Sequence, residues 1–150
     1  MTRIFIGADS AGFELKELIR NRLAEEGYEV TDVGTDSTAS CHYPIFAAAV
    51  ARGVQATPDS LGILVCGTGI GMSMAANKFE GIRAAVCGDT FSARMTRMHN
   101  DANVLCIGAR VIGPGLANDI VDLFLTTDFE GGRHATRVDM ITAIERGESI

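Results

Sequence analysis

Short apolar runs of strand length recur along the chain, and segments with the spacing of amphipathic helices separate them. This alternation predicts βαβ units, in which parallel strands form one sheet and helices cover both of its faces. The apolar runs are uninterrupted, as expected for strands that are buried on both sides. We therefore predict a three-layer α/β/α, Rossmann-like fold with a five-stranded parallel sheet. The predicted strands are Ile4–Ile6, Tyr28–Val33, Leu61–Val65, Ile82–Val86 and Val104–Ile107.

Six segments are predicted to be helical from the spacing of their apolar residues. The first begins at Phe13 and stops near Gly27. No internal repeat, low-complexity tract or linker divides the 150 residues, so one domain spanning residues 1–150 is expected. The five further predicted helices are Ile45–Val54, Met72–Phe79, Phe91–Met98, Leu116–Phe124 and Arg133–Arg146.

Charge and composition exclude several classes of function. A net charge of −6 argues against nucleic acid as a partner, because binding to phosphate backbones needs a basic surface. The four cysteines show neither a CxxC pair nor the spacing of metal ligands. No apolar run approaches the roughly 18 residues of a membrane span, and no signal peptide precedes the first strand. We expect a protein of the reducing cytoplasm without a membrane partner.

The stretch Leu61–Phe79 combines a buried strand, a glycine-rich turn and the start of a helix. Glycines at alternate positions bring backbone N–H groups close to a ligand, and a helix start adds unpaired donors and a positive dipole end. Cys66 ends the strand at the rim of this turn, where a thiol becomes a reactive thiolate more readily. The pattern favours a nucleophile or base beside an anion site. The alternative is a cysteine that only fills the core.

In parallel α/β sheets, ligands bind beyond the carboxyl ends of the strands. Polar residues that follow the predicted strands, or the helix before the last strand, are therefore predicted to share one rim. Each also has a purely structural explanation, such as capping of a helix or stabilisation of a turn. The candidates are Asp9, Cys66, Thr68, His99, Asn100 and Arg110.

A second basic element lies near the end of the chain. Arg133 and Arg137 are four residues apart, so a helix places both on one face. Two guanidinium groups at a helix start suit a phosphate dianion. The alternative is a solvated helix face.

Four familiar sequence patterns of proteins that bind or transfer phosphate or bind nucleotides are absent. A cysteine-dependent phosphatase needs an arginine at the position that Met72 occupies after Cys66. A dinucleotide fingerprint needs GxGxxG after the first strand, whereas this chain has GxGxG after the third. A Walker loop needs GK followed by Ser or Thr, which does not occur. A phospho-acceptor receiver domain would carry an aspartate in place of Cys66.

Taken together, the motifs resemble those of the ribose-5-phosphate isomerase B family, which includes the galactose-6-phosphate isomerase subunits. The resemblance extends along nearly the whole chain. Several blocks in the same order are far more specific than any one of them. These blocks are GADSAG, Tyr43-Pro44, CGTGIGMSMAANKFEGIRAAVC, HNDANVLCIGARVIG, FEGGRH with the following Arg137, and ITAIE.

The resemblance implies an aldose–ketose isomerase that acts on a sugar phosphate without a metal or cofactor. It also implies a homodimer or a dimer of dimers, with each active site shared between subunits. By the same resemblance, Cys66 moves a proton between C1 and C2, Thr68 supports this transfer, and His99 with Asp9 opens the furanose ring. The resemblance also implies an anion hole formed by Gly67, Thr68, Gly69, Ile70 and Gly71. Ser10, Tyr43 and Asn100 are implied to contact the sugar. The implied phosphate contacts are Arg110, Arg133, Arg137 and His134.

One departure from the family concerns the residue after Asp9. The family usually has a histidine there, close to the phosphate end of the substrate, and this chain has Ser10. Ribose 5-phosphate remains the leading substrate. The alternative substrates are erythrulose or erythrose 4-phosphate, allose or galactose 6-phosphate, and a rare free aldose. A sensor that binds a sugar phosphate or a nucleotide without turnover is the alternative from a different class.

Overall fold

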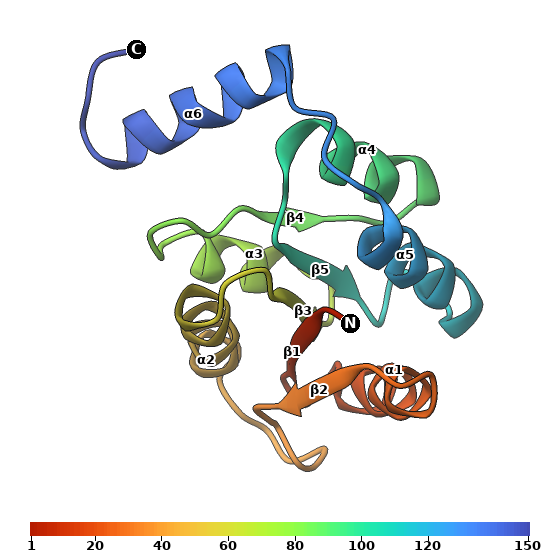
Figure 1. Ribbon diagram of the computed structural model, residues 1–150. Helices are drawn as coiled ribbons and strands as arrows, with labels where there is room; N and C mark the ends of the chain where they lie inside the picture. Colours follow the sequence, from red (N-terminus) through yellow and green to blue (C-terminus); the bar gives the residue numbers. More distant parts are fainter.

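The computed structural model describes all 150 residues, and its five strands form one parallel sheet in the order β2-β1-β3-β5-β4 (Figure 1). The predicted α/β class and the five-stranded parallel sheet are therefore confirmed. The fourth strand is shorter than predicted, because the amide of Ile82 closes a turn onto the carbonyl of Phe79. The strands are β1 (Arg3–Ala8), β2 (Glu29–Asp32), β3 (Leu61–Cys66), β4 (Ala84–Val86) and β5 (Val104–Gly108).

All six predicted helices are present; their ends differ from the predicted ones by one to three residues, and the largest error is at the end of the third helix. The third helix stops at Ala76 and not at Phe79, because the amides of Lys78 and Phe79 close turns onto the carbonyls of Ala75 and Ala76. The helices are α1 (Phe13–Glu25), α2 (Tyr43–Ala56), α3 (Ile70–Ala76), α4 (Thr90–Asn100), α5 (Pro114–Thr126) and α6 (Arg133–Glu145). None of them combines the length and the apolar character that crossing a membrane requires.

The sheet has an apolar layer on each face, as expected for a doubly covered parallel sheet. One layer packs the strands against α1 and α5, through residues such as Ile19 and Phe124. The other packs them against α2 and α3, through residues such as Val50 and Met72. Every residue of β3 and of β5 is buried, so the two strands form a rigid base for whatever follows their last residues.

The strand order reverses between β1 and β3. From β1 the chain passes through α1 to β2, and it then returns across β1 through α2 to β3. Ala8 pairs with Val65, so both strands end at the same level. Such a reversal leaves a crevice at the carboxyl ends of the two strands, which is where α/β sheets bind ligands.

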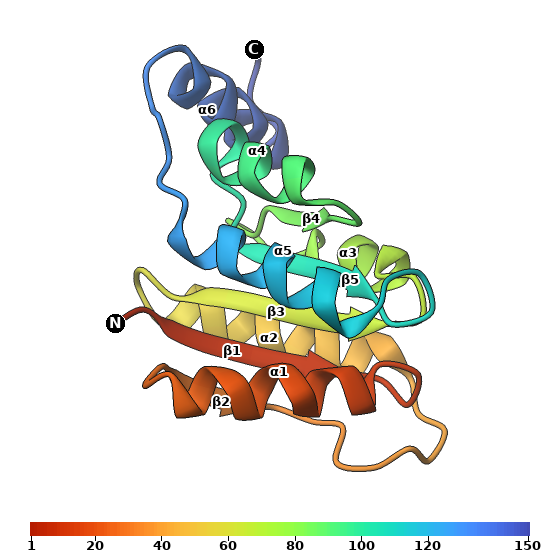
Figure 2. The ribbon, with the colours of Figure 1, turned by 90° about the vertical axis from the view of Figure 1, so that its right-hand side faces the viewer.

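The last helix lies apart from the sheet. Figures 1 and 2 show α6 on the outer side of α4, separated from the strands. Only His134 and Val138 of α6 are buried, whereas Met140, Ile141 and Ile144 are 41%, 49% and 60% exposed. An apolar helix face of this kind is left without a partner in the single chain.

Candidate active site

Cys66 is the last residue of β3, and its sulfur is held by the turn that follows. The amide of Gly69 donates a hydrogen bond to Cys66 Sγ over 3.1 Å. A backbone N–H directed at sulfur stabilises negative charge there. The residue is only 5% exposed and lies beside Cys106 and Met72 in the layer under α2 and α3. The sulfur is thus fixed by main chain and packing rather than by a flexible side-chain partner.

Gly69 is needed for the shape of this turn. Its φ of +80° is a left-handed conformation, and a Cβ there would lie 3.0 Å from the backbone of Ile107. The turn can therefore run directly against β5. Thr68 accepts a hydrogen bond from the amide of Ile70 over 3.2 Å, so its hydroxyl also stabilises the turn.

Some backbone amides of this turn donate hydrogen bonds within the turn, and others have no acceptor in the chain. We predicted that all five amides from Gly67 to Gly71 form an anion hole. Two of them already have acceptors, because Gly69 donates to Cys66 and Ile70 donates to Thr68. The amides of Gly67, Thr68, Gly71 and Met72 have no acceptor within the chain. Gly69 and Ile70, at the centre of the predicted anion hole, therefore have acceptors already, whereas the free amides include Met72, one residue beyond the predicted set.

Asp9 lies next to this turn at the reversal of strand order. Its amide donates to the carbonyl of Val65 over 3.2 Å, and its carboxylate accepts from the amide of Gly12 over 3.0 Å. Gly12 packs so tightly that a Cβ would lie 2.2 Å from the carbonyl oxygen of Val65. Asp9 therefore caps a turn before α1, and the close packing of that turn fixes its position. Ser10 follows in the same turn and is partly exposed.

Tyr43 and Arg110 complete this end of the sheet. A Cβ on Gly71 would lie 2.7 Å from the Tyr43 ring, so the phenol lies directly over the start of α3. A Cβ on Gly67 would lie 3.5 Å from Arg110, whose amide donates to the carbonyl of Gly67. The structure thus brings together what we call the strand-end group, which consists of Asp9, Ser10, Tyr43, Cys66, Gly67–Gly71 and Arg110.

The remaining candidates lie at the opposite end of the sheet. A helix between two parallel strands runs against them, so α4 ends where β5 begins. The carbonyl of Asn103 accepts from the amide of Gly62 at the start of β3, whereas Cys66 pairs with Gly108 at the end of β5. At roughly 3.3 Å per residue, the ends of β5 are about 13 Å apart. The prediction that His99 and Asn100 share one rim with Cys66 within this chain is therefore wrong.

His99 and Asn100 instead lie near the start of α6. The His99 and His134 rings stack with centroids 4.1 Å apart and an angle of 10° between their planes. Arg133 and Arg137 are exposed on the same helix, as the four-residue spacing predicts. We call this second set, which consists of His99, Asn100, Arg133, His134 and Arg137, the helix group.

Three side chains of this region offer potential metal ligands. Ligand atoms of His99, Glu130 and His134 lie within 4.8 Å of one another. The lone pairs of imidazole nitrogens lie in the plane of the ring, however, and the two rings lie in nearly parallel planes, so their lone pairs do not converge on a common point. Burial lowers the pKa of His134 most, and the nearby Arg133 and Arg137 lower it further; the charge of these arginines also opposes a divalent cation. The geometry fits an aromatic stack better than a chelate.

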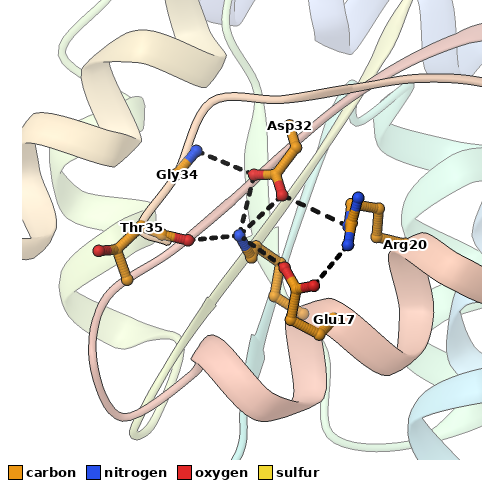
Figure 3. A network of polar contacts seen from close by, with 6 residues as sticks. Glu17, Arg20, Asp32, Gly34 and Thr35 are labelled. Carbon is orange, nitrogen blue, oxygen red and sulfur yellow. Dashed lines mark hydrogen bonds and ion pairs between the residues drawn. The ribbon is translucent and has the colours of Figure 1, made fainter. Parts of the chain in front are cut away.

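Sequence reasoning missed a buried ionic network beside the strand-end group (Figure 3). The Lys16 ammonium is fully buried; it contacts both carboxylate oxygens of Asp32 at 2.9 Å and donates to the carbonyl of Thr35. Glu17 and Arg20 extend the network at the surface of α1. Thr35 in turn pairs with Ala8, the residue before Asp9. The signal was a lysine at an apolar position of α1, three residues before Ile19.

None of the four cavities of the single chain contains Cys66. One is a groove of about 480 Å³ beneath α6, with an apolar side formed by Ile82, Ala84, Ala85, Ile141 and Ile144. It also includes Asn100 of the helix group. The single chain therefore has no cavity at Cys66, and it has an unfilled apolar groove beside the helix group.

Comparison with known proteins identifies the family. The family model described as Ribose/Galactose Isomerase matches residues 4–141. The chain belongs to the ribose/galactose isomerase family. The family resemblance that the sequence blocks predicted is therefore confirmed.

Individual members of the ribose/galactose isomerase family are similar over almost their whole length. Ribose-5-phosphate isomerase B of Escherichia coli (strain K12) is 51% identical over 146 residues, which cover 97% of this chain and 98% of the relative. D-erythrulose-4-phosphate isomerase of Pectobacterium atrosepticum is 46% identical over 149 residues, covering 99% and 98%. The solved structure of Clostridium thermocellum ribose-5-phosphate isomerase B has a TM-score of 0.96 at 51% identity, covering 99% of this chain and 100% of that one.

Proposed function

We propose that this protein is an aldose–ketose isomerase that interconverts ribose 5-phosphate and ribulose 5-phosphate. The observation that carries the proposal is the position of Cys66. It ends a buried strand at the reversal of strand order, beside Asp9, with its sulfur held by the Gly69 amide. The same chain is 51% identical to a ribose-5-phosphate isomerase B over nearly its full length.

The chemistry needs a base and a set of fixed hydrogen-bond donors. In the open-chain sugar, the Cys66 thiolate takes the proton from C2, and the electron pair of that bond forms the enediolate with C1. The free amides of Gly71 and Met72 can donate to the developing oxygen charge. Donors that are already oriented stabilise the transition state more than the ground state. The hydroxyl on C2 then passes its proton to O1, and return of the abstracted proton from Cys66 to C1 gives the ketose.

The helix group supplies the other contacts in this proposal. Arg133 and Arg137 hold the phosphate, because two exposed guanidinium groups on one helix face match a dianion. His99 exchanges protons with the sugar during ring opening, together with Asp9 of the strand-end group. Asn100 binds the sugar hydroxyls.

The two groups meet, we propose, in a homodimer, where the strand-end group of one subunit faces the helix group of its partner. Two observations support this arrangement. The groups lie at opposite ends of the sheet in one chain. The apolar face of α6 and the groove beneath it have no partner within the chain. A two-fold dimer buries such a face twice and completes two identical sites.

A turnover panel tests the activity. We expect the wild-type enzyme to isomerise ribose 5-phosphate, with rates measured for aldose and ketose phosphates of four, five and six carbons and for the free sugars. Thermal-shift binding of the same sugar phosphates without any turnover would instead favour the sensor. The panel also decides the length of the substrate.

Mixed dimers test the shared site. Neither Cys66→Ala nor His99→Asn should have activity alone, but a heterodimer of the two contains one intact site out of two. Random mixing in co-expressed protein should therefore restore about a quarter of the wild-type activity, because half of the dimers are mixed. A mixture that stays inactive while both chains assemble would mean that each site lies within one chain.

A four-carbon substrate is the second candidate, and one specific observation favours it. The relative named D-erythrulose-4-phosphate isomerase is 46% identical over 99% of this chain. Ser10 offers a hydroxyl where the family usually has an imidazole, so the strand-end group has one potential cation fewer for the phosphate. In the turnover panel, this candidate predicts a higher kcat/KM for erythrose 4-phosphate than for ribose 5-phosphate.

A further inference from the structure

The stacked pair of His99 and His134 joins two elements that are far apart in the sequence. His99 is in the last turn of α4, and His134 is the second residue of α6. Their rings are 4.1 Å apart and nearly parallel, at 10°. A flat contact of this kind prevents one ring from tilting without the other moving. The orientation of the His99 ring therefore depends on what holds His134.

The segment before α6 holds His134 in place. The amide of Glu130 donates to the carbonyl of Met98, which ties this segment to the end of α4. Gly131 and Gly132 follow with φ of +68° and +59°, conformations that turn the chain sharply into the helix. His134 is only 6% exposed as a result. It is a built-in part of the fold and not a free surface side chain.

The polar edge of the His134 ring is directed at one carboxylate. Glu130 Oε2 lies 3.5 Å from His134 Nε2, and this buried nitrogen has no hydrogen-bond partner within the chain. Burial, the neighbouring His99 and Arg133 lower the pKa of His134, whereas Glu130 raises it. The net effect is a lowered pKa, which favours the uncharged ring. An uncharged neighbour can support His99 without competing with it for a proton.

We propose that His134, with Glu130 at its nitrogen, is a positioning residue that orients His99 for opening of the sugar ring, and that it is not a phosphate ligand. This proposal rests on the proposed function. In ring opening, the C1–O4 bond breaks, the proton of the hydroxyl on C1 leaves, and a proton is added to O4. Both transfers need a side chain at a defined angle, and a side chain that is locked by packing provides one.

The choice of sugar separates positioning from phosphate binding. Ribose 5-phosphate closes a furanose ring through O4, whereas erythrose 4-phosphate cannot, because its O4 carries the phosphate. Both substrates present a phosphate, but only the first needs ring opening. A ring-opening defect therefore affects one substrate, and a phosphate-binding defect affects both.

We therefore expect His134→Ala to lower kcat for ribose 5-phosphate by about tenfold to a hundredfold, because a displaced catalytic group costs this much. KM should change little, and turnover of erythrose 4-phosphate should stay within about twofold of wild type. His134→Phe keeps a flat ring and should recover most of the lost rate. Thr136→Ala, an exposed neighbour on α6, is the matched control.

Spectroscopy of the imidazoles gives a second measurement that needs no substrate. The chain has three histidines, so their ring signals can be assigned by substitution. His134→Ala should move and broaden the His99 ring signals in the NMR spectrum, and His134→Phe should restore sharp, ring-shifted signals.

Several results would overturn this proposal. A rise in KM for both sugar phosphates would make His134 a phosphate ligand, and an unchanged His99 spectrum in His134→Ala would remove the positioning role. If the wild type turns over only ribose 5-phosphate, a rise in KM with an unchanged kcat in His134→Ala would likewise make His134 a phosphate ligand. A wild-type protein that turns over no sugar phosphate refutes the proposed function instead, and the spectrum still tests the stack.

Discussion

The strand-end group and the helix group differ in how the fold holds them. Most of the strand-end group follows β1, β3 and β5, and β3 and β5 are buried throughout. The group is positioned mainly by backbone contacts, as between Asp9 and Val65. The helix group lies on α4 and on a helix with only two buried residues. The first therefore has a fixed geometry in the single chain. The second has exposed side chains, which in the proposed dimer a partner subunit encloses.

The difference suggests a division of tasks. Proton transfer between C1 and C2 depends on angstrom-level geometry, and we assign it to the group on the sheet. Binding of a phosphate dianion tolerates more movement, and we assign it to exposed arginines on α6. Within the helix group, His134 is the buried member, and its stack on His99 holds both rings in place.

The largest effect is expected at Cys66. Cys66→Ala should lower kcat by about a thousandfold, because the proposed base is lost, while circular dichroism and the melting temperature stay close to wild type. Cys41→Ala is the matched control, since this free cysteine lies outside both groups. Wild-type turnover by Cys66→Ala would assign the base to another residue.

The next largest effect is expected from the buried ionic network around Lys16, which lies beside the strand-end group. Lys16→Met should reduce the free energy of unfolding by about 3 kcal/mol, because Asp32 and the Thr35 carbonyl lose their buried partner. Urea denaturation measures this change. Lys78→Met, at an exposed position, serves as the control and should change stability by less than about 0.5 kcal/mol. Equal losses in both variants would show that the network does not support this end of the sheet.

A smaller effect is expected from the helix group. Arg137→Ala should raise KM for ribose 5-phosphate about 30-fold, equivalent to about 2 kcal/mol for a lost charged hydrogen bond, with little change in kcat. Free ribose should be unaffected. Arg146→Ala, at the end of the same helix, is the control. An equal rise in KM for the free sugar would contradict the phosphate role.

The smallest effect is expected at Gly131, in the turn that leads into α6. Gly131 has open space around its Cα and a φ of +68°, so Gly131→Ala should cost only the left-handed strain of about 1 kcal/mol. Gly88→Ala, also in open space but without a positive φ, should cost less. Thermal unfolding compares the two. If Gly131→Ala loses much more stability than Gly88→Ala, the turn before α6 contributes to the stability of the whole protein. Equal losses of stability in the two variants would mean that α6 unfolds separately.

The strand-end group could be predicted from the sequence because it depends on local order. An apolar run followed by Cys66 and alternating glycines already contains the strand, the turn and the helix start. The turn around Gly69 adds one detail that the sequence did not predict. Two of its amides are used within the turn, and this depends on the backbone angles.

The helix group was placed wrongly for a physical reason. His99 and Asn100 were assigned to the rim of Cys66 because they precede the last strand, although a crossover helix runs antiparallel to the strands it connects. Its end therefore lies at the start of β5, the far edge of the sheet. The contact of His99 with His134 bridges 35 positions of sequence, and no local pattern indicates it.

The sequence by itself determined the order of strands and helices, the parallel sheet, the cysteine at the end of β3 and the family, because these follow from hydrophobic periodicity and short motifs. The tertiary structure alone decided which candidates lie together, how Lys16 is neutralised and how His134 stacks on His99. Such contacts depend on the direction and packing of whole elements. A one-dimensional pattern does not contain that information.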